Sequence, residues 1–278
     1  MIELALTEER RKVLAALLND EERLRVEYPK VDDYLSTALG LPGTGDNRID
    51  NAFDLRFVHY VTGGRTESEN PYWDIVSPFV HECDGRRLVN AGHSNGSGRL
   101  AYAQMLLQGI FAYAIPSPET IEWIAAFCAG RPMIELGAGR GYWAAQITRA
   151  GVSVQAYDSS PPDKEDNSSF SPATGQIETW HHVGNIEEFD RDVASRPGYV
   201  LLLCWPPGWG APMASEALAA FERAGGERLI FVGQHKGGMT GDDAFFEALS
   251  NGWTLESEDS RHVSWWNIPD VAEGWVRR

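Results

Sequence analysis

The sequence predicts an α/β fold, a parallel β-sheet with helices on both faces, preceded by a helical N-terminal region. After Gly130, six short apolar or β-branched runs appear, and segments of helix length separate most of them, as in a parallel sheet. Before it, successive segments carry apolar residues at helical spacing. We therefore expect a helical N-terminal or cap region over 1–116 and a Rossmann-like domain over 117–278. The six expected strands are 132–136, 152–158, 179–183, 199–205, 228–234 and 253–258.

The N-terminal elements are predicted from caps and breaks. Thr7 precedes two acids and a leucine stripe, which is typical of a helix start. Further helices are expected over 21–39, 51–61 and 99–113, with a polar, Gly-rich loop over 82–98. Ser117 and Pro118 begin another helix, which ends at Gly130. The Pro- and Ser-rich segment 159–179 is expected to replace or shorten the second crossover helix.

The composition of the chain limits the classes of partner and the cellular compartment that we expect. The chain has 24 Lys plus Arg against 40 Asp plus Glu, a net charge of −16. This charge disfavours nucleic acid, because affinity for phosphate backbones depends on clustered cations. The three cysteines form no CxxC pair, so we expect neither a bound metal nor a disulfide framework. Neither a signal peptide nor a transmembrane stretch is recognisable, so we expect a cytoplasmic protein without a membrane partner.

The clearest motif is a glycine-rich turn at 133–142, MIELGAGRGY. A strand runs into Glu135, and three alternate glycines then open a helix. Glycine suits a sharp turn that a ligand approaches closely. Asp158 ends the next strand about 20 residues later, the distance at which an acid meets ribose hydroxyls in such folds. The alternative is a strand–helix turn without a ligand.

The acid followed by G-x-G-x-G resembles motif I of class I S-adenosylmethionine (SAM)-dependent methyltransferases, over about residues 131–278. The resemblance implies a Rossmann-like sheet of that type and SAM as cofactor. Asp158 would then bind the ribose, and Asn185 would either flank the adenine or cap the following helix. The implied cofactor-binding residues are Glu135, Gly137, Ala138, Gly139, Gly141, Asp158, Asn185, Ile186, Cys204 and Tyr113.

The stretch YVLLLCWPPGW at 199–209 resembles motif IV of amino-methyltransferases, whose usual form is Asp/Asn/Ser-Pro-Pro-aromatic. Here Trp205 stands in the acceptor position, and an indole offers a donor but no acceptor. Trp205 and Pro206 are the catalytic candidates at this turn, and Trp205 and Trp209 are candidates for binding substrate. Aromatic faces suit a sulfonium methyl or a developing ammonium. The alternative is that both tryptophans are packing residues.

A weaker resemblance links this Trp-Pro-Pro motif and the runs around 212–218 and 230–246 to an uncharacterised group of methyltransferase-like proteins. It implies no substrate. His235, in the loop after the fifth strand, is a candidate general base or a plain surface histidine. His59, on an N-terminal helix, is a candidate for covering bound substrate.

Three functions remain in view. The favoured one is a SAM-dependent methyltransferase that acts on a small molecule through an N, O or carbon nucleophile, by direct methyl displacement. The second is a nucleic-acid amino-methyltransferase of the N6-adenine type, against which the charge and the missing acceptor both argue. The third is a SAM-binding module without turnover. Oligomeric state and methyl acceptor are left open by the sequence.

Overall fold

The structure is a computed structural model that describes residues 4–162, 179–196 and 198–278. The chain divides into two compact units. Of the described residues, the first holds 4–111 and 265–267, and the second holds the rest. The domain limits drawn from the sequence, 1–116 and 117–278, stay a prediction. Most of the polar segment expected to replace a crossover helix, residues 163–178, lies outside the described residues.

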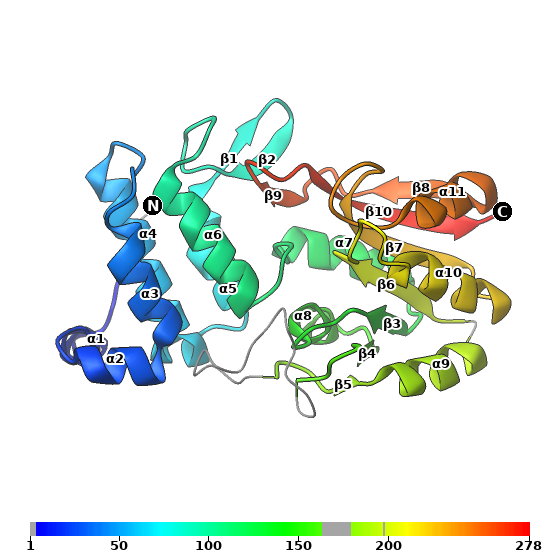
Figure 1. Cartoon of the computed structure of the whole chain (residues 1–278), viewed down its shortest axis with the longest axis horizontal. Coiled ribbons are helices and arrows are strands. Elements are labelled where there is room, and N and C mark those ends of the chain that lie inside the picture. The colour runs from blue at the N-terminus through cyan, green and yellow to red at the C-terminus, as the bar shows by residue number, and fades with distance from the viewer. Residues whose placement is uncertain (1–3, 163–178, 197) are drawn as a thin grey trace. The chain divides into compact units, whose positions relative to one another are not determined.

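The first unit is mainly helical, as expected (Figure 1). Its helices begin where the sequence supplies caps: the Thr7 hydroxyl accepts from the Arg10 amide at 3.1 Å. The expected helix over 21–39 is two helices, because Pro29 lacks an amide proton and disfavours helical geometry at Tyr28. The elements are α1 (Glu8–Leu18), α2 (Glu21–Glu27), α3 (Pro29–Ala38), α4 (Asn47–Val61), η1 (Gly63–Glu67), α5 (Pro71–Val76), η2 (Ser77–Phe79) and α6 (Gly98–Ile110).

A β-hairpin occupies the start of the segment predicted to be a loop over 82–98. Strand β1 (Val80–Cys83) pairs antiparallel with β2 (Arg86–Val89). The two residues between them, Asp84 and Gly85, both have positive φ, at 51° and 74°. That conformation matches the twist of a two-residue hairpin, and Asp-Gly is a favoured sequence for it. The Asp-Gly pair was therefore the signal for this hairpin.

The second unit is built on a seven-stranded sheet with the order β5-β4-β3-β6-β7-β10-β8 (Figure 1). Six strands run parallel, and β10 lies antiparallel between β7 and β8. The expected strand over 179–183 is reduced to two residues. Strands β9 and β10 were not predicted. The strands are β3 (Met133–Leu136), β4 (Val154–Tyr157), β5 (Val183–Gly184), β6 (Val200–Cys204), β7 (Arg228–Gln234), β8 (Trp253–Glu258) and β10 (Asp270–Arg277). Strand β9 (Val263–Trp265) belongs to a separate, three-stranded sheet.

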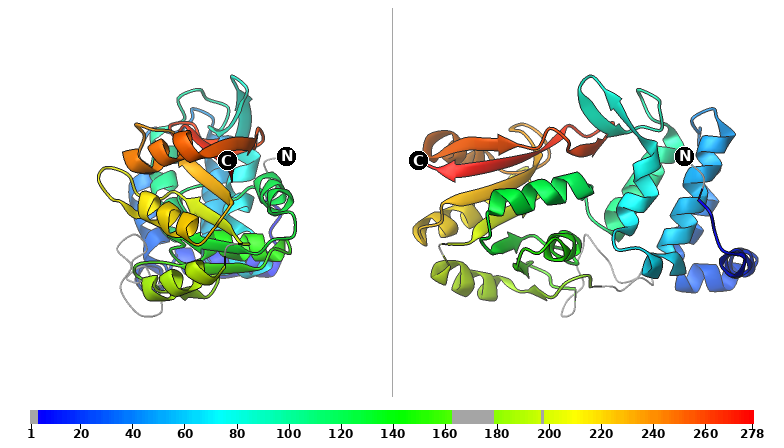
Figure 2. Two further views of the ribbon diagram at one scale, coloured as in Figure 1. Left: turned by 90° about the vertical axis from the view of Figure 1, so that its right-hand side faces the viewer. Right: turned by 180° about the vertical axis from the view of Figure 1, so that it is seen from behind.

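Helices cover both faces of this sheet. One face packs against α9, α10 and α11 through a buried cluster that includes Ile134, Leu201 and Phe231. The view from behind in Figure 2 shows α7 and α8 on the other face. Because side chains alternate along a strand, Glu135 points to the α7 and α8 side. The helices are α7 (Pro118–Cys128), α8 (Tyr142–Arg149), α9 (Ile186–Ser195), α10 (Met213–Arg223) and α11 (Asp243–Gly252).

The strand order reverses between β3 and β6. From β3 the chain moves outward through β4 and β5, then returns to β6 on the other side of β3 and continues to β7. In open α/β sheets, ligands bind beyond the carboxyl ends of the strands at such a reversal. Glu135 pairs in register with Leu202 of β6, so the glycine motif and the Trp-Pro-Pro turn leave the sheet side by side at this point. No helix in the described ranges has the length and apolar character needed to span a membrane.

Candidate functional site

The glycine turn between β3 and α8 has the backbone that the sequence predicted. Gly137, Gly139 and Gly141 have φ values of 82°, 56° and 75°, a region that glycine enters without strain. The Gly137 and Ala138 amides both donate to the Tyr157 carbonyl, at 2.9 and 3.0 Å. The turn is thereby fixed against the end of β4.

Asp158 holds the same turn from the next strand. One carboxylate oxygen accepts from the Gly139 amide at 2.8 Å, and the other accepts from the Ser160 amide at 3.0 Å. Burial raises the pKa of Asp158, and hydrogen bonds from Ser160, Gly139 and Ser159 oppose that shift. Asp158 therefore orders the glycine turn from the end of the neighbouring strand.

Glu135 is a buried carboxyl group just below the turn. Its side chain is 2% exposed, and its Oε2 atom has no hydrogen-bond partner in the described part of the chain. Burial, followed by the charge of Asp158, raises the pKa of Glu135 to about 8. A buried polar atom without a partner costs about 1–3 kcal/mol, so its retention calls for an explanation. A ligand that donates a hydrogen bond to Oε2 would supply one.

Asn185 caps helix α9, one of the two roles the sequence left open. Its side-chain oxygen accepts from the Glu188 amide at 2.9 Å, and the Glu188 carboxylate accepts from the Asn185 amide at 2.9 Å. Ile186 is the first residue of that helix. A contact between either residue and an adenine stays a prediction.

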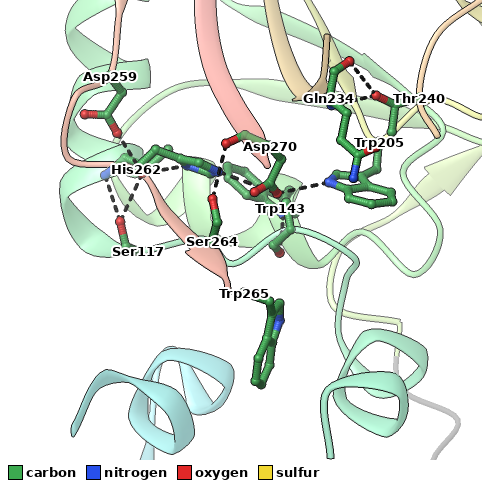
Figure 3. Close-up of polar contacts among 12 residues, drawn as sticks. Ser117, Trp143, Trp205, Gln234, Thr240, Asp259, His262, Ser264, Trp265 and Asp270 are labelled. Carbon is green, nitrogen blue, oxygen red and sulfur yellow. Dashed lines mark hydrogen bonds and ion pairs between the residues drawn. The ribbon is translucent and has the colours of Figure 1, made fainter. Parts of the chain in front are cut away.

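The turn after β6 has a strained start. Trp205 has φ 54°, a left-handed conformation that costs a bulky side chain on the order of 1–3 kcal/mol. Its amide donates to the Val232 carbonyl at 2.7 Å, and its indole N–H donates to Asp270 Oδ2 at 3.2 Å (Figure 3). The Tyr113 ring stacks on the indole with 5.4 Å between centroids and 11° between planes.

The Pro-Pro part of the turn is clamped by the loop after β7. The Gly241 amide donates to the Pro206 carbonyl at 3.0 Å, and the Gly208 amide donates to the Met239 carbonyl at 3.0 Å. Thr240 bonds the end of β7 through its hydroxyl, which accepts from the Gln234 amide at 2.7 Å. The Pro206 carbonyl, which a target amine would approach in the motif, already accepts one hydrogen bond.

Cys204 links the two halves of the site. It is the last residue of β6, and burial raises the pKa of its thiol well above the usual value, with further contributions from the charges of Glu135 and Asp270. In the strand register, Cys204 lies two residues beyond Leu202, the partner of Glu135, and pairs with Val232, two residues before the Gln234 that pairs with Asp270. The end of β3, the end of β6 and the start of β10 therefore come together at the carboxyl edge of the sheet.

The remaining sequence candidates have different surroundings. His235 is exposed, and its Nε2 atom lies 2.8 Å from the Glu273 carboxylate. Trp209 is 83% exposed and has φ 52°. His59 belongs to the first unit, where it is buried and its Nδ1 atom accepts from Arg10 at 3.1 Å. Burial and the nearby Arg10 charge lower the pKa of His59.

Sequence reasoning missed Asp270 and His262. Asp270 starts β10 and pairs in register with Gln234, the last residue of β7, because β10 runs antiparallel. His262 Nε2 lies 3.7 Å from Asp270 Oδ2 (Figure 3). The strand-like run around 270–277 was the signal that a seventh strand would bring an acid to this edge. Within the described ranges, no group of three or more His, Cys, Asp or Glu side chains is arranged to hold a metal ion.

The sheet is a Rossmann-like sheet with helices on both faces, and a helical region precedes it in the chain. No protein-family model matches the sequence, and no curated protein sequence matches it. Among solved structures, the chain is similar to magnesium protoporphyrin IX methyltransferase from Synechocystis PCC 6803 with bound SAM. That match has 15% identity and a TM-score of 0.33, over 58% of this chain and 79% of the other.

Two further structures show similarity of the same order. The CcbJ methyltransferase from Streptomyces caelestis is 15% identical, with a TM-score of 0.33 over 58% of this chain and 94% of its own. A mutant of MtNAS in complex with SAM is 12% identical, with a TM-score of 0.38 over 98% of this chain and 99% of its own. All three TM-scores lie below 0.5, so these similarities do not indicate an activity for this chain.

Proposed function

We propose that this protein is a SAM-dependent methyltransferase that acts on a small molecule. The observation that carries the proposal is the buried Glu135 carboxyl beside a turn of three positive-φ glycines that Asp158 orders. Among the described residues, its Oε2 atom has no hydrogen-bond partner. Two acidic groups at this turn disfavour a pyrophosphate ligand, because they bring no positive charge to the phosphate oxygens. They suit a ligand with an amine and ribose hydroxyls, which SAM provides.

The residues present fit that cofactor. Glu135 would accept from its methionine portion, the glycine turn would lie against it, and Asp158 would accept from the ribose. Asn185 and Ile186 would flank the adenine, and Cys204 and Tyr113 would lie beside the methyl donor. Bound SAM would supply an activated methyl group, so the protein's own task is alignment of the acceptor.

The acceptor would lie beyond the ends of β6 and β7. We infer that Trp205 and Trp209 bind it, that the Trp-Pro-Pro turn orients it, and that His235 removes a proton where the nucleophile requires it. His59 is proposed to cover the bound acceptor. A soluble, cytoplasmic small-molecule enzyme is consistent with the acidic composition.

A second candidate, a SAM-binding module without turnover, is favoured by the chemistry of this turn. Trp205 donates through its indole and offers no acceptor, and the Pro206 carbonyl already accepts from Gly241. The same facts argue against a nucleic-acid amino-methyltransferase. Detection of a methylated product by mass spectrometry, with labelled SAM and a metabolite extract, separates turnover from binding.

Gly139→Arg is the sharpest test of the cofactor site. The change forces a side chain into a positive-φ position whose amide bonds Asp158, so SAM binding measured by calorimetry should fall at least about tenfold. Gly130→Arg is the matched control, since Gly130 also has positive φ, at 79°, but a Cβ there meets nothing within 4 Å. Unchanged affinity in a folded Gly139→Arg protein would refute the site.

A further inference from the structure

The half-buried indole of Trp205 donates a hydrogen bond to a buried carboxylate. Asp270 is 5% exposed, and its Oδ2 atom accepts the indole N–H at 3.2 Å. The other oxygen, Oδ1, has no hydrogen-bond partner in the part of the chain that the structure describes. A buried carboxylate with one oxygen unpartnered needs a compensating charge or donor nearby.

A histidine ring lies beside this carboxylate. His262 Nε2 lies 3.7 Å from Asp270 Oδ2, and His262 is charged only if protonated. Its other ring nitrogen is 3.4 Å from the Thr120 hydroxyl, which donates to Asp259 Oδ2 at 2.7 Å. These contacts fix the position of His262 beside Asp270. Figure 3 shows His262, Asp270 and the Trp205 indole in sequence.

A carboxylate on the indole N–H changes what the ring can bind. Accepting the N–H pushes electron density into the ring, so the ring face becomes a better partner for a cation. The Tyr113 ring already stacks on Trp205, which fixes the ring plane. The Trp205 ring is therefore an aromatic surface with the Asp270 carboxylate at its rim. It lies at the carboxyl ends of the strands, where Glu135 and the glycine turn also lie.

We propose that Trp205 and Asp270 form a subsite for an organic cation, either the SAM sulfonium or an ammonium group of the methyl acceptor. The inference rests on the proposed function in that it places this subsite beside the SAM site. Trp205 would touch the cation, whereas Asp270 would act through Trp205 and is therefore a positioning residue. The substrate class that fits best is an amine whose methylation leaves a positive charge.

The first arm of the test compares SAM with S-adenosylhomocysteine, which lacks the sulfonium charge. Calorimetry on the full chain gives both dissociation constants for the wild type and for Asp270→Asn, which keeps the shape of the side chain and removes its charge. If the cation is the sulfonium, the preference for SAM should fall about threefold to tenfold, with affinity for S-adenosylhomocysteine unchanged. A purely structural role would weaken both ligands equally.

The matched control is Glu222→Gln. Glu222 Oε1 accepts the indole N–H of Trp253 at 2.7 Å, and that indole is fully buried. Trp253 is paired in register with Arg277, at the far end of β10 from Asp270, so this pair lies at the opposite edge of the sheet. Glu222→Gln should leave both dissociation constants unchanged.

The second arm uses tetramethylammonium as the probe, with sodium chloride at equal ionic strength as reference. If the cation belongs to the acceptor, the wild type should bind tetramethylammonium in the presence of S-adenosylhomocysteine, and Asp270→Asn and Trp205→Leu should each weaken that binding about threefold or more. The double variant should lose no more than either single one.

The outcomes are separable. A selective change in either arm supports the subsite and identifies the source of the cation. If neither arm shows a selective change, the proposed subsite is wrong. Failure of the wild type to bind SAM and S-adenosylhomocysteine would defeat the proposed function. The tetramethylammonium arm, repeated on the protein alone, would then still support or overturn the cation subsite.

Discussion

Asp158 and Glu135 are buried carboxyl groups of this site, and burial gives each a different role. Asp158 uses both oxygens to order the glycine turn. Glu135 lies beside that turn, and one of its oxygens has no hydrogen-bond partner among the residues that the structure describes. The pKa of each is raised, chiefly because burial disfavours the charged form. Glu135 thus offers a ligand a buried hydrogen-bond acceptor, and Asp158 orders the turn beside it.

Burial of Glu135 predicts a pH-dependent stability. Its pKa rises from 4.5 to about 8 on folding, so between these values the folded state binds more protons than the unfolded chain. The free energy of unfolding should therefore fall as pH rises through that window and level off above it. Glu135→Gln removes this loss, so its stability relative to wild type should increase from pH 4.5 to 8.

Urea denaturation at a series of pH values measures this difference. Glu187→Gln serves as control, because Glu187 is exposed on the first turn of α9 and its replacement should not alter the pH profile. A constant difference between Glu135→Gln and wild type across the window would contradict the burial argument.

At the scale of elements, local signals account for the ends of helices and the turns of the site. Ser117 caps α7 with Pro118 at its first position, as expected. The glycine turn is tight because neighbours approach it closely: a Cβ on Gly141 would lie 2.8 Å from the His181 Cβ. Residue types that the sequence shows directly are enough to predict these features.

Asn185→Ala tests whether one residue serves both a helix and a ligand. Loss of the capping box at α9 should cost about 1 kcal/mol in the free energy of unfolding. If Asn185 also contacts the adenine, SAM affinity should fall as well. Asn70→Ala is the control, since Asn70 Oδ1 caps α5 by accepting from the Trp73 amide at 3.2 Å. Equal effects of both variants on stability, with unchanged SAM affinity, would leave Asn185 a cap alone.

For the whole molecule, the charge of −16 predicts no appreciable affinity for nucleic acid. Fluorescence anisotropy with labelled single-stranded and duplex DNA at low salt should show no binding, because acidic residues outnumber the cations that would displace counterions. A protein known to bind DNA, measured with the same labelled DNA under the same conditions, is the positive control. Binding that weakens steeply as salt rises would revive the amino-methyltransferase alternative.

Features of this protein that depend on neighbours along the chain could be predicted from its residues. Alternation of strand and helix predicted the Rossmann-like sheet, and the acid, three glycines and second acid predicted the turn at 133–142, because caps and positive-φ positions are local properties. The hairpin at 80–89 was missed although its Asp-Gly turn is equally local, since the surrounding polar residues were interpreted as a loop.

Which groups share the carboxyl edge of the sheet depends on contacts between segments that are far apart in the sequence. Strand β10 enters antiparallel between β7 and β8, which carries Asp270 to an indole 65 positions away in sequence. The reversal between β3 and β6 likewise brings Glu135 and Cys204 together. Such contacts depend on strand order and direction, which follow from packing of the whole sheet and not from any short run of residues.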